Sequence, residues 1–369
     1  MTPTIQPAPE TSTSPGLRPA TGAPVSPEAA PVTRAGRGPL LRWGALIGAG
    51  VLLTLVALAS LRYGSISLSA ADAWNALFHY NPDSYEQTVV RHLRLPRTLI
   101  GLGVGAALAV AGAAIQAVTR NPLAGPEILG VNSGAAFGVV AAVYFGQLVE
   151  PFQFVWFAFL GGLAAAALVS GVASAGPAGS SPVKLALAGV IVSSLLQSWL
   201  TGLLLLDQQT LDVVRFWMAG SLAGRSLEIY RAVLPFLAVG VAGLVTLGPH
   251  LNVASLGEET ARALGLKPHQ IRWLVGGFSV LAVGAAVAVA GPIGFVGLAV
   301  PHIVRAVVGP DYRWVLPLSV LVGPLLLLSA DLLGRVVARP AEIQVGIVTA
   351  ITGAPVLIGL ARRRKVVEL

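Results

Sequence analysis

The segment Arg91–Arg97 carries three arginines within the seven residues RHLRLPR. Arg94 and Arg97 are three residues apart and would share one face of a helix. Pro96 disfavours helix at Leu95 but is a favourable opener for a helix that follows. Forked guanidinium groups can capture a carboxylate. The residues leave open an equally simple alternative, an interfacial basic cap whose side chains extend toward water.

A short helix is predicted within the segment 252–272. Ser255 and Glu258 form the S-x-x-E pattern of a capping box, and Gly265 and Pro268 predict the end of a helix of about nine residues. A helix this short is not stable alone. It either docks into a groove on another protein or lies on the bilayer surface. Its apolar side would be formed by Leu256, Ala263 and Leu264, and its polar side by Glu258, Glu259 and Arg262.

Two proline-interrupted segments, Asn121–Gly130 and Gly291–His302, each predict a break in the helical pattern. An interrupted segment inside a membrane domain can line a pathway, although a plain turn fits equally well. His302 has no second ligand at helical spacing, which favours a packed or hydrogen-bonded histidine. The polar residues that we assign to the wall of a pathway are Gln116, Asn121, Pro122, Asn132 and Gln197.

Several catalytic patterns are missing from the sequence. There is no G-x-x-x-x-G-K-[ST] motif for ATP hydrolysis, no H-E-x-x-H and no G-x-S-x-G. The chain has no cysteine, so it has no thiolate metal site and no cysteine nucleophile. Asp331 is the one acidic candidate for proton relay or sodium coordination within a span, and a paired helix-end carboxylate is the simpler interpretation. We therefore expect no enzymatic activity, no metal site and no bound cofactor.

The composition places these segments in a membrane protein. Of the 369 residues, 55% are hydrophobic and 11% are charged, and the mean hydropathy is +0.78. A soluble domain carries about 25% charged residues. The composition excludes an ordinary soluble enzyme and also a chain that is disordered throughout. A net charge of +8 is compatible with nucleic-acid binding, but the hydropathy favours a membrane protein with basic flanks.

The predicted fold is all-α, with about ten transmembrane helices. A span needs roughly 20 apolar residues. One uncharged run ends in a Gly/Ser/Pro-rich turn, and another is divided by Gly291-Pro292 and Pro301 into a full helix and a short one. The period-2 pattern of a membrane β-barrel is not visible. The uncharged runs cover residues 43–61, 98–119, 128–149, 151–183, 185–206, 232–257, 273–304, 314–330 and 343–361.

The two ends of the chain are predicted to be cytoplasmic. Residues 1–39 are rich in Pro, Thr, Ser, Ala and Gly, which indicates a disordered tail before a transmembrane domain at 40–365. Basic residues flank the first span and follow the last one, and both therefore indicate the inner side. Nine arginines would still face the outer side, including Arg225 and Arg231. They are either a chance distribution or a face that attracts an acidic partner or an anionic solute.

The sequence contains an internal similarity. Val104–Gly112 reads VGAALAVAG and Val283–Gly291 reads VGAAVAVAG, with eight of nine positions identical. The two segments would run in opposite directions through the membrane, as in an inverted repeat of the second-to-fifth and seventh-to-tenth helices. Chance similarity between Ala/Gly-rich helices is the alternative. In either case small residues allow helices to approach closely.

With these segments in view, the chain resembles the FecCD-type permease subunits of ABC importers over about residues 40–365. That family transports ferric siderophores, haem and cobalamin. Several long matches in the same order make the resemblance specific. The segments that carry it are Arg94–Leu99, Val104–Ala135, Leu256–Leu266, Gly291–Arg305, Leu325–Arg335 and Gly346–Ile358.

The resemblance implies a ten-helix subunit of the cytoplasmic membrane that pairs with a second permease copy or a close homologue. It implies that residues 255–266 form a coupling helix seated in a separate ATP-hydrolysing subunit. It also implies that Arg94, Arg97 and Arg335 meet glutamates of a periplasmic or lipid-anchored solute-binding protein. The expected coupling residues are Ser255, Leu256, Gly257, Glu258, Glu259, Ala263, Leu264 and Gly265.

The expected function is ATP-driven import of a ferric siderophore, with haem or cobalamin as alternative cargo. An ion-coupled secondary transporter is a rival that the internal repeat alone would allow. An intramembrane enzyme is disfavoured because no catalytic constellation is present. Lipid is the expected surrounding, and no nucleic-acid partner is expected.

Overall fold

The computed structural model describes residues 38–64, 68–175 and 182–362, with side chains described up to residue 355. The chain divides into two units, Met1–Gly36 and Arg37–Leu369. The predicted tail lies outside the described residues except at its last two positions. All regular structure in the described part of the second unit is helical.

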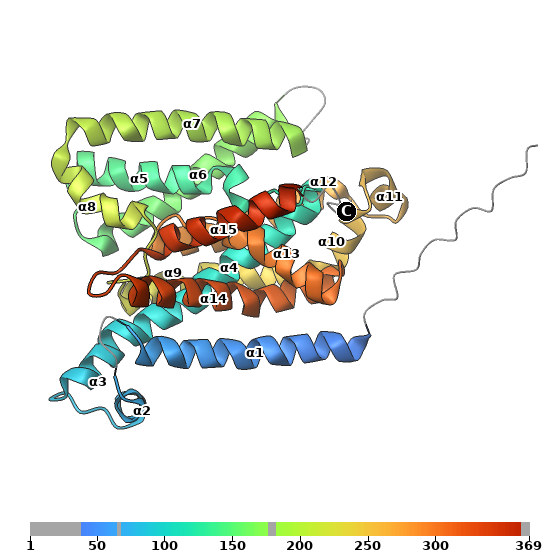
Figure 1. The fold of residues 1–369 in the computed structure, drawn as a ribbon. Coiled ribbons are helices and arrows are strands. Elements are labelled where there is room, and N and C mark those ends of the chain that lie inside the picture. Colours follow the sequence, from blue (N-terminus) through green and yellow to red (C-terminus); the bar gives the residue numbers. More distant parts are fainter. Residues whose placement is uncertain (1–37, 65–67, 176–181, 363–369) are drawn as a thin grey trace, which may run out of the picture. The chain divides into compact units, whose positions relative to one another are not determined.

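Among the described residues of the second unit, ten helices are apolar and at least ten residues long, which agrees with the predicted number of about ten. Figure 1 shows how they are arranged. Seven are long enough to cross a membrane: α1 (Pro39–Arg62), α4 (Leu95–Thr119), α6 (Pro151–Ser174), α7 (Pro182–Leu206), α9 (Leu227–Thr246), α12 (Pro268–Ala290) and α14 (Tyr312–Val337). The three shorter ones are α5 (Val131–Gly146), α13 (Val296–Val308) and α15 (Val345–Arg362).

Short helices lie at the two ends of this bundle. At one end, which we call the α3 end, α2 (Ala70–Phe78), α3 (Tyr85–Val89), the π-helical turn η1 (Val90–Arg94) and α8 (Gln208–Met218) join the long helices (Figure 1). At the opposite end, the α11 end, lie α10 (Gly248–Ser255) and α11 (Glu258–Ala263). A 3₁₀ turn, η2 (Pro126–Leu129), precedes α5.

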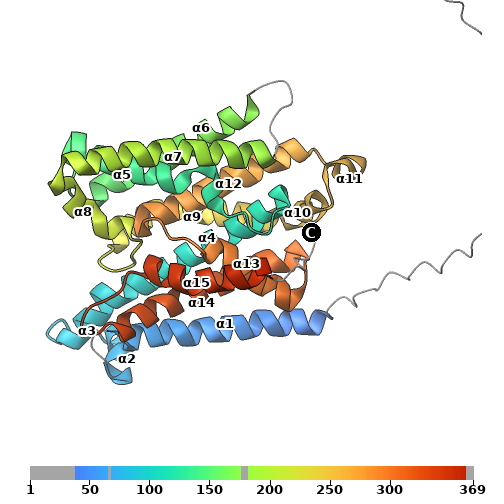
Figure 2. The same cartoon turned by 45° about the horizontal axis from the view of Figure 1, so that its top comes forward.

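Helix α4 is the centre of the bundle. It is buried along most of its length, and α9, α12, α13 and α14 pack around it (Figure 2). Helix α1 contrasts with it, because it buries only Ser60 and Leu61 and exposes apolar side chains along the rest of its length. An outer helix that exposes leucine, isoleucine and tryptophan is expected where lipid replaces water as the solvent.

Small residues bring α4 against its neighbours. A Cβ atom added at Gly112 would lie 1.8 Å from the carbonyl oxygen of Gly297 on α13. A Cβ atom added at Gly105 would lie 2.5 Å from the Cα atom of Pro324 on α14. Both obstacles are backbone atoms, so a side chain at either position forces the helices apart. The Ala/Gly-rich sequence of this segment therefore reflects close helix–helix packing.

Gly112→Ala is expected to destabilise the chain by roughly 1–3 kcal/mol, because overpacking shifts the backbone. Gly276→Ala on α12 is the matched control, since nothing lies within 4 Å of a Cβ atom added there. Thermal unfolding of the purified proteins in detergent measures the difference. Equal unfolding midpoints for the two variants would contradict the close contact between α4 and α13.

The internal similarity falls on two helices that run in opposite directions. Helix α4 leaves the α3 end, whereas α12 leaves the α11 end and crosses back (Figure 1). The predicted break after the second copy is confirmed. Helix α12 ends at Ala290, Gly291 adopts a φ of 75°, and α13 begins only at Val296.

Candidate functional sites

Arg97 lies at the α3 end in a network of buried charges. Its Nε atom donates to both carboxylate oxygens of Asp331 at 3.0 Å, and its Nη2 atom donates to Oδ1 at 2.7 Å. Its Nη1 atom donates to Glu342 at 2.6 Å. Asp331 comes from α14 and is 0% exposed. The interpretation of Asp331 as a paired carboxylate is therefore confirmed, although α14 continues to Val337, six residues beyond it.

Arg335 completes the network one helical turn after Asp331, to which its Nη2 atom is bound at 2.9 Å. The same atom donates to the Ser60 hydroxyl at 2.6 Å, and Nη1 donates to the carbonyl oxygens of Ser60 and Tyr63 at 3.1 Å. Arg335 therefore joins α14 to the end of α1. It is 1% exposed, so in this structure its guanidinium binds groups of this chain and is shielded from solvent.

Arg94 also binds the end of α1. Its Nη1 atom donates to the carbonyl oxygens of Leu61 at 3.0 Å and Arg62 at 2.6 Å. The structure thus brings the three predicted docking arginines, Arg94, Arg97 and Arg335, into one cluster with internal acceptors. Contact with a solute-binding protein stays a prediction for them. The cluster holds three guanidinium groups and two carboxylates, Asp331 and Glu342, and so keeps an excess positive charge.

Sequence reasoning missed Glu342. This residue lies in the connection 338–344 between α14 and α15, and it is 245 positions from the arginine that it binds. No local pattern joins residues so far apart in the sequence. Its polarity beside Pro340 indicates only a turn.

The five predicted pathway residues lie on α4, in the turn that follows it, on α5 and on α7. Gln116 is 0% exposed, and its amide oxygen accepts a 2.6 Å hydrogen bond from Arg305 on α13, a partner that sequence reasoning missed. Asn121 accepts from the backbone N–H of Leu123 at 2.9 Å and shapes a turn. The remaining three are Pro122 in the same turn, Asn132 on α5 and Gln197 on the exposed side of α7. Their role in a pathway stays a prediction.

His302 is half-buried on α13, and its Nδ1 atom lies 2.8 Å from the carbonyl oxygen of Leu298. This agrees with the hydrogen-bonded histidine expected from the sequence. Among the described residues, no group of three or more His, Cys, Asp or Glu side chains lies close enough to hold a metal ion.

The predicted capping box is wrong in this structure. Ser255 ends α10, and its hydroxyl donates to the carbonyl oxygen of Asn252 at 2.8 Å. Pro249 lies in the first turn of α10, which begins directly after α9. Helix α10 extends through Ser255, so Ser255 ends one helix and does not cap the start of the next. Helix α11 then begins at Glu258, with Gly257 at a φ of 111° as its N-cap, and spans six residues rather than about nine.

The predicted end of that helix at Gly265 is correct. Gly265 has a φ of 80°, and its N–H donates to the carbonyl oxygen of Arg262 at 2.9 Å. The N–H of Leu266 donates to the carbonyl oxygen of Ala261 at 2.9 Å, which completes the turn. Pro268 opens α12 rather than ending α11.

Two leucines give the α11 segment an exposed apolar surface. Leu256 is 63% exposed and Leu264 is 62% exposed. Glu258 pairs with Arg262 within α11 at 3.2 Å, and its pair with Arg272 of α12 anchors the segment to the bundle. The Glu258–Arg272 pair therefore links the start of α11 to the N-terminal part of α12.

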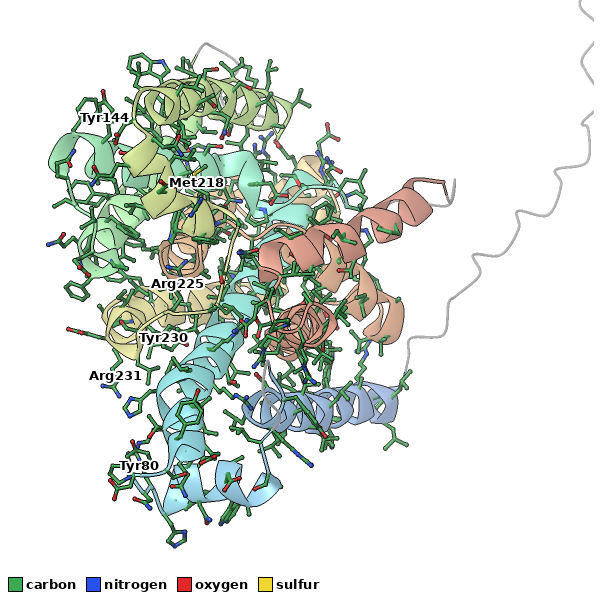
Figure 3. All side chains as sticks on the ribbon, turned by 60° about the vertical axis from the view of Figure 1, so that its left-hand side comes forward. Tyr80, Tyr144, Met218, Arg225, Tyr230 and Arg231 are labelled. Carbon is green, nitrogen blue, oxygen red and sulfur yellow. The ribbon has the colours of Figure 1, made fainter. Side chains whose placement is uncertain are left out.

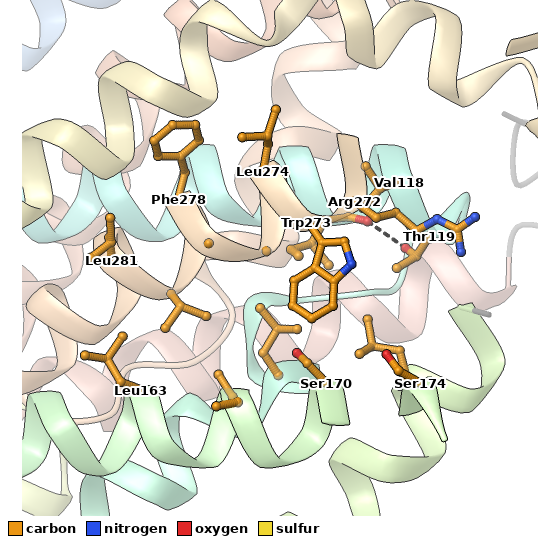
Figure 4. A pocket seen from close by; sticks show the side chains of 18 residues that line it. Val118, Thr119, Leu163, Ser170, Ser174, Arg272, Trp273, Leu274, Phe278 and Leu281 are labelled. Carbon is orange, nitrogen blue, oxygen red and sulfur yellow. Dashed lines mark hydrogen bonds between the residues drawn. The ribbon is translucent and has the colours of Figure 1, made fainter. Parts of the chain in front are cut away.

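Two cavities lie at opposite ends of the bundle. The cavity at the α11 end has about 470 Å³, and apolar residues of α4, α6 and α12 line most of it (Figure 4). Arg272 and Trp273 of α12 also line it (Figure 4). The cavity at the α3 end has about 350 Å³, and its walls include Arg97, Arg225 and Glu342.

These features define a polytopic helical membrane protein with a polar network at one end and an exposed helix at the other. The FecCD transport family matches residues 52–363, and the chain belongs to this family. The resemblance inferred from the sequence is thereby confirmed.

Similar proteins agree with this assignment. The permease YfmD of the Fe(3+)-citrate import system of Bacillus subtilis is 45% identical over 304 residues, which cover 82% of this chain and 90% of YfmD. The permease FepD of the ferric enterobactin transport system of Escherichia coli is 44% identical over 323 residues, covering 87% and 95%. A solved metal-chelate type ABC transporter in an inward-facing conformation aligns with a TM-score of 0.76 and 34% identity, covering 87% of this chain and 99% of that one. The chain is the membrane permease subunit of an importer of this type.

Proposed function

We propose that this chain translocates a ferric siderophore across the cytoplasmic membrane, driven by a separate ATP-hydrolysing subunit. The exposed α11 segment is the observation that supports the proposal most strongly. Leu256 and Leu264 present an apolar surface at the α11 end, beside the acidic start of α11. A short helix of this kind suits a groove on a partner protein.

In this proposal the α11 segment, residues 255–266, is the coupling helix. Closure of the ATPase subunits moves α11 as a rigid lever, and the Glu258–Arg272 pair carries the movement into α12. The energy comes from the different affinity of the ATPase for the two states of the permease. The permease itself performs no chemistry and binds no cofactor.

The proposed assembly has two permease subunits, an ATPase and a solute-binding protein. The second permease subunit is either another copy of this chain or a close homologue. Both chain ends and α11 lie in the cytoplasm, and the α3 end faces outward. The solute-binding protein docks at the α3 end, where the Arg94–Arg97–Arg335 cluster keeps excess positive charge. An acidic surface on that protein would complement it.

Ferric siderophore is the proposed cargo, and haem or cobalamin is the alternative. The cargo is tested by ATP-dependent uptake into proteoliposomes that hold the complete importer. Ferric citrate, a ferric hydroxamate, a ferric catecholate, haem and cobalamin are offered one at a time. Uptake of a ferric chelate but not of haem or cobalamin is expected. Uptake of haem or cobalamin alone would contradict the siderophore proposal.

A further inference from the structure

Arg225 lies in the wall of the 350 Å³ cavity at the α3 end, on the connection between α8 and α9. Figure 3 labels it on this end of the bundle, with Arg231 at the edge of the same view. Its Nε atom donates to the carbonyl oxygen of Ser221 at 3.3 Å. Among the described residues, Arg225 has no carboxylate within ion-pair distance.

The connection that carries Arg225 is held in place at several points. The N–H of Ser221 donates to the carbonyl oxygen of Ala290 at 2.8 Å. The N–H of Gly346 donates to the carbonyl oxygen of Gly220 at 3.0 Å. Ser226 caps α9 by accepting from the N–H of Ile229 at 3.2 Å. The guanidinium is therefore presented by backbone tied to the end of α12 and the start of α15. A preorganised group loses little freedom when it binds a ligand.

The charge of Arg225 is poorly compensated by its surroundings. Burial lowers the pKa of Arg225 to about 10, and no acidic group opposes this effect. The side chain is still cationic at neutral pH. The other charges in the cavity wall, Arg97 and Glu342, neutralise each other through their ion pair, so Arg225 leaves one net positive charge facing the cavity. A bound anion would supply the missing counter-charge.

The other residues that line the cavity suit a ligand with a ring better than a ligand that consists of a carboxylate group alone. Phe154, Phe216 and Trp217 line it, and the rings of Phe154 and Trp217 meet edge-to-face at 6.5 Å. Ser221 and Gln344 add polar groups. A volume of about 350 Å³ lies within the range of small-molecule sites, roughly 300–1,000 Å³. A lone glutamate side chain from a partner would leave most of this space unfilled.

We infer that this cavity binds a small anionic organic ligand, with Arg225 as its counter-ion and the aromatic walls against its ring or chain. The inference rests on the proposed function, because an iron-chelate importer handles ligands with carboxylate or catecholate arms. It identifies the cavity as the place where those anionic groups of the ligand first contact the permease. Arg97 and Glu342 stay paired and form the far wall.

The test compares two probes that differ in charge, 2,3-dihydroxybenzoate and the neutral 2,3-dihydroxybenzamide. Titration calorimetry uses the full chain in lipid nanodiscs. The anion is expected to bind at least about tenfold more tightly than the amide, since the amide carbonyl still accepts a hydrogen bond from Arg225 but offers neither the negative charge nor the second acceptor oxygen of the carboxylate. Arg225→Gln is expected to abolish this preference, and Arg225→Lys to retain part of it. Arg231→Gln, at an exposed arginine near the start of α9, is expected to leave it unchanged.

Equal binding of the anion by the wild type and by Arg225→Gln would overturn the inference, as would equal binding of the two probes by the wild type. An unchanged unfolding temperature shows that the Arg225→Gln variant is folded. The complete importer is assayed separately for ATP-driven chelate uptake. Uptake without selective anion binding would refute only this site, whereas absence of uptake for every chelate would refute the proposed function.

Discussion

Leu264→Asp is expected to reduce ATP-driven uptake by at least about tenfold while the chain still folds and reaches the membrane. Leu264 is 62% exposed at the end of α11, so its replacement removes no internal packing. In the assembled importer the same position would lie inside a groove of the ATPase. An aspartate there buries an unpaired charge, and losing an apolar anchor at the centre of an interface costs about 2 kcal/mol or more.

The control for this experiment is Gln270→Asp. Gln270 is exposed in the first turn of α12, where an added carboxylate favours the helix dipole. The control thus adds the same charge near α11 without altering the proposed contact. Chelate uptake and ATP hydrolysis are measured together in proteoliposomes. Normal uptake by Leu264→Asp would mean that α11 is not the coupling element.

Asp331→Asn is expected to destabilise the permease by about 3–5 kcal/mol, the cost of breaking a buried ion pair. The carboxylate is 0% exposed and binds Arg97 and Arg335 together. An amide keeps the shape but cannot offset two guanidinium charges. Because Arg335 also holds the end of α1, we expect α1 to separate from α14 at lower temperature in the variant.

The matched control is Asp212→Asn, which breaks the surface pair between Asp212 and Arg215. Both side chains of that pair are more than half exposed, so the expected change is within about 1 kcal/mol. Thermal unfolding of monodisperse protein in detergent compares the two variants. Similar midpoints for both would show that the Asp331 network contributes little to stability.

The sequence predicted the membrane helices well because their signal is local. Runs of apolar residues long enough for a bilayer locate the spans, and Gly291 with Pro292 locates the break between α12 and α13. The closing turn at Gly265 was predictable for the same reason, since a positive φ after a helix favours glycine.

The sequence was a poorer guide where structure depends on distant partners. Ser255 followed by Glu258 matches a capping box, but Pro249 opens a helix that includes Ser255. The cluster of Arg97, Asp331 and Glu342 joins three segments of the chain, and no local spacing indicates it. The arginines were recognised as important, whereas their internal acceptors required the fold.

The central claim is that uphill transport by this chain depends on ATP hydrolysis by a partner subunit. The most direct measurement is cargo accumulation in proteoliposomes that hold the permease and its solute-binding protein, with and without the ATPase. Ferric chelate should accumulate only when the ATPase and ATP are both present, whatever sodium or proton gradient is imposed. Accumulation against a gradient in vesicles that lack the ATPase would contradict the account and favour an ion-coupled transporter.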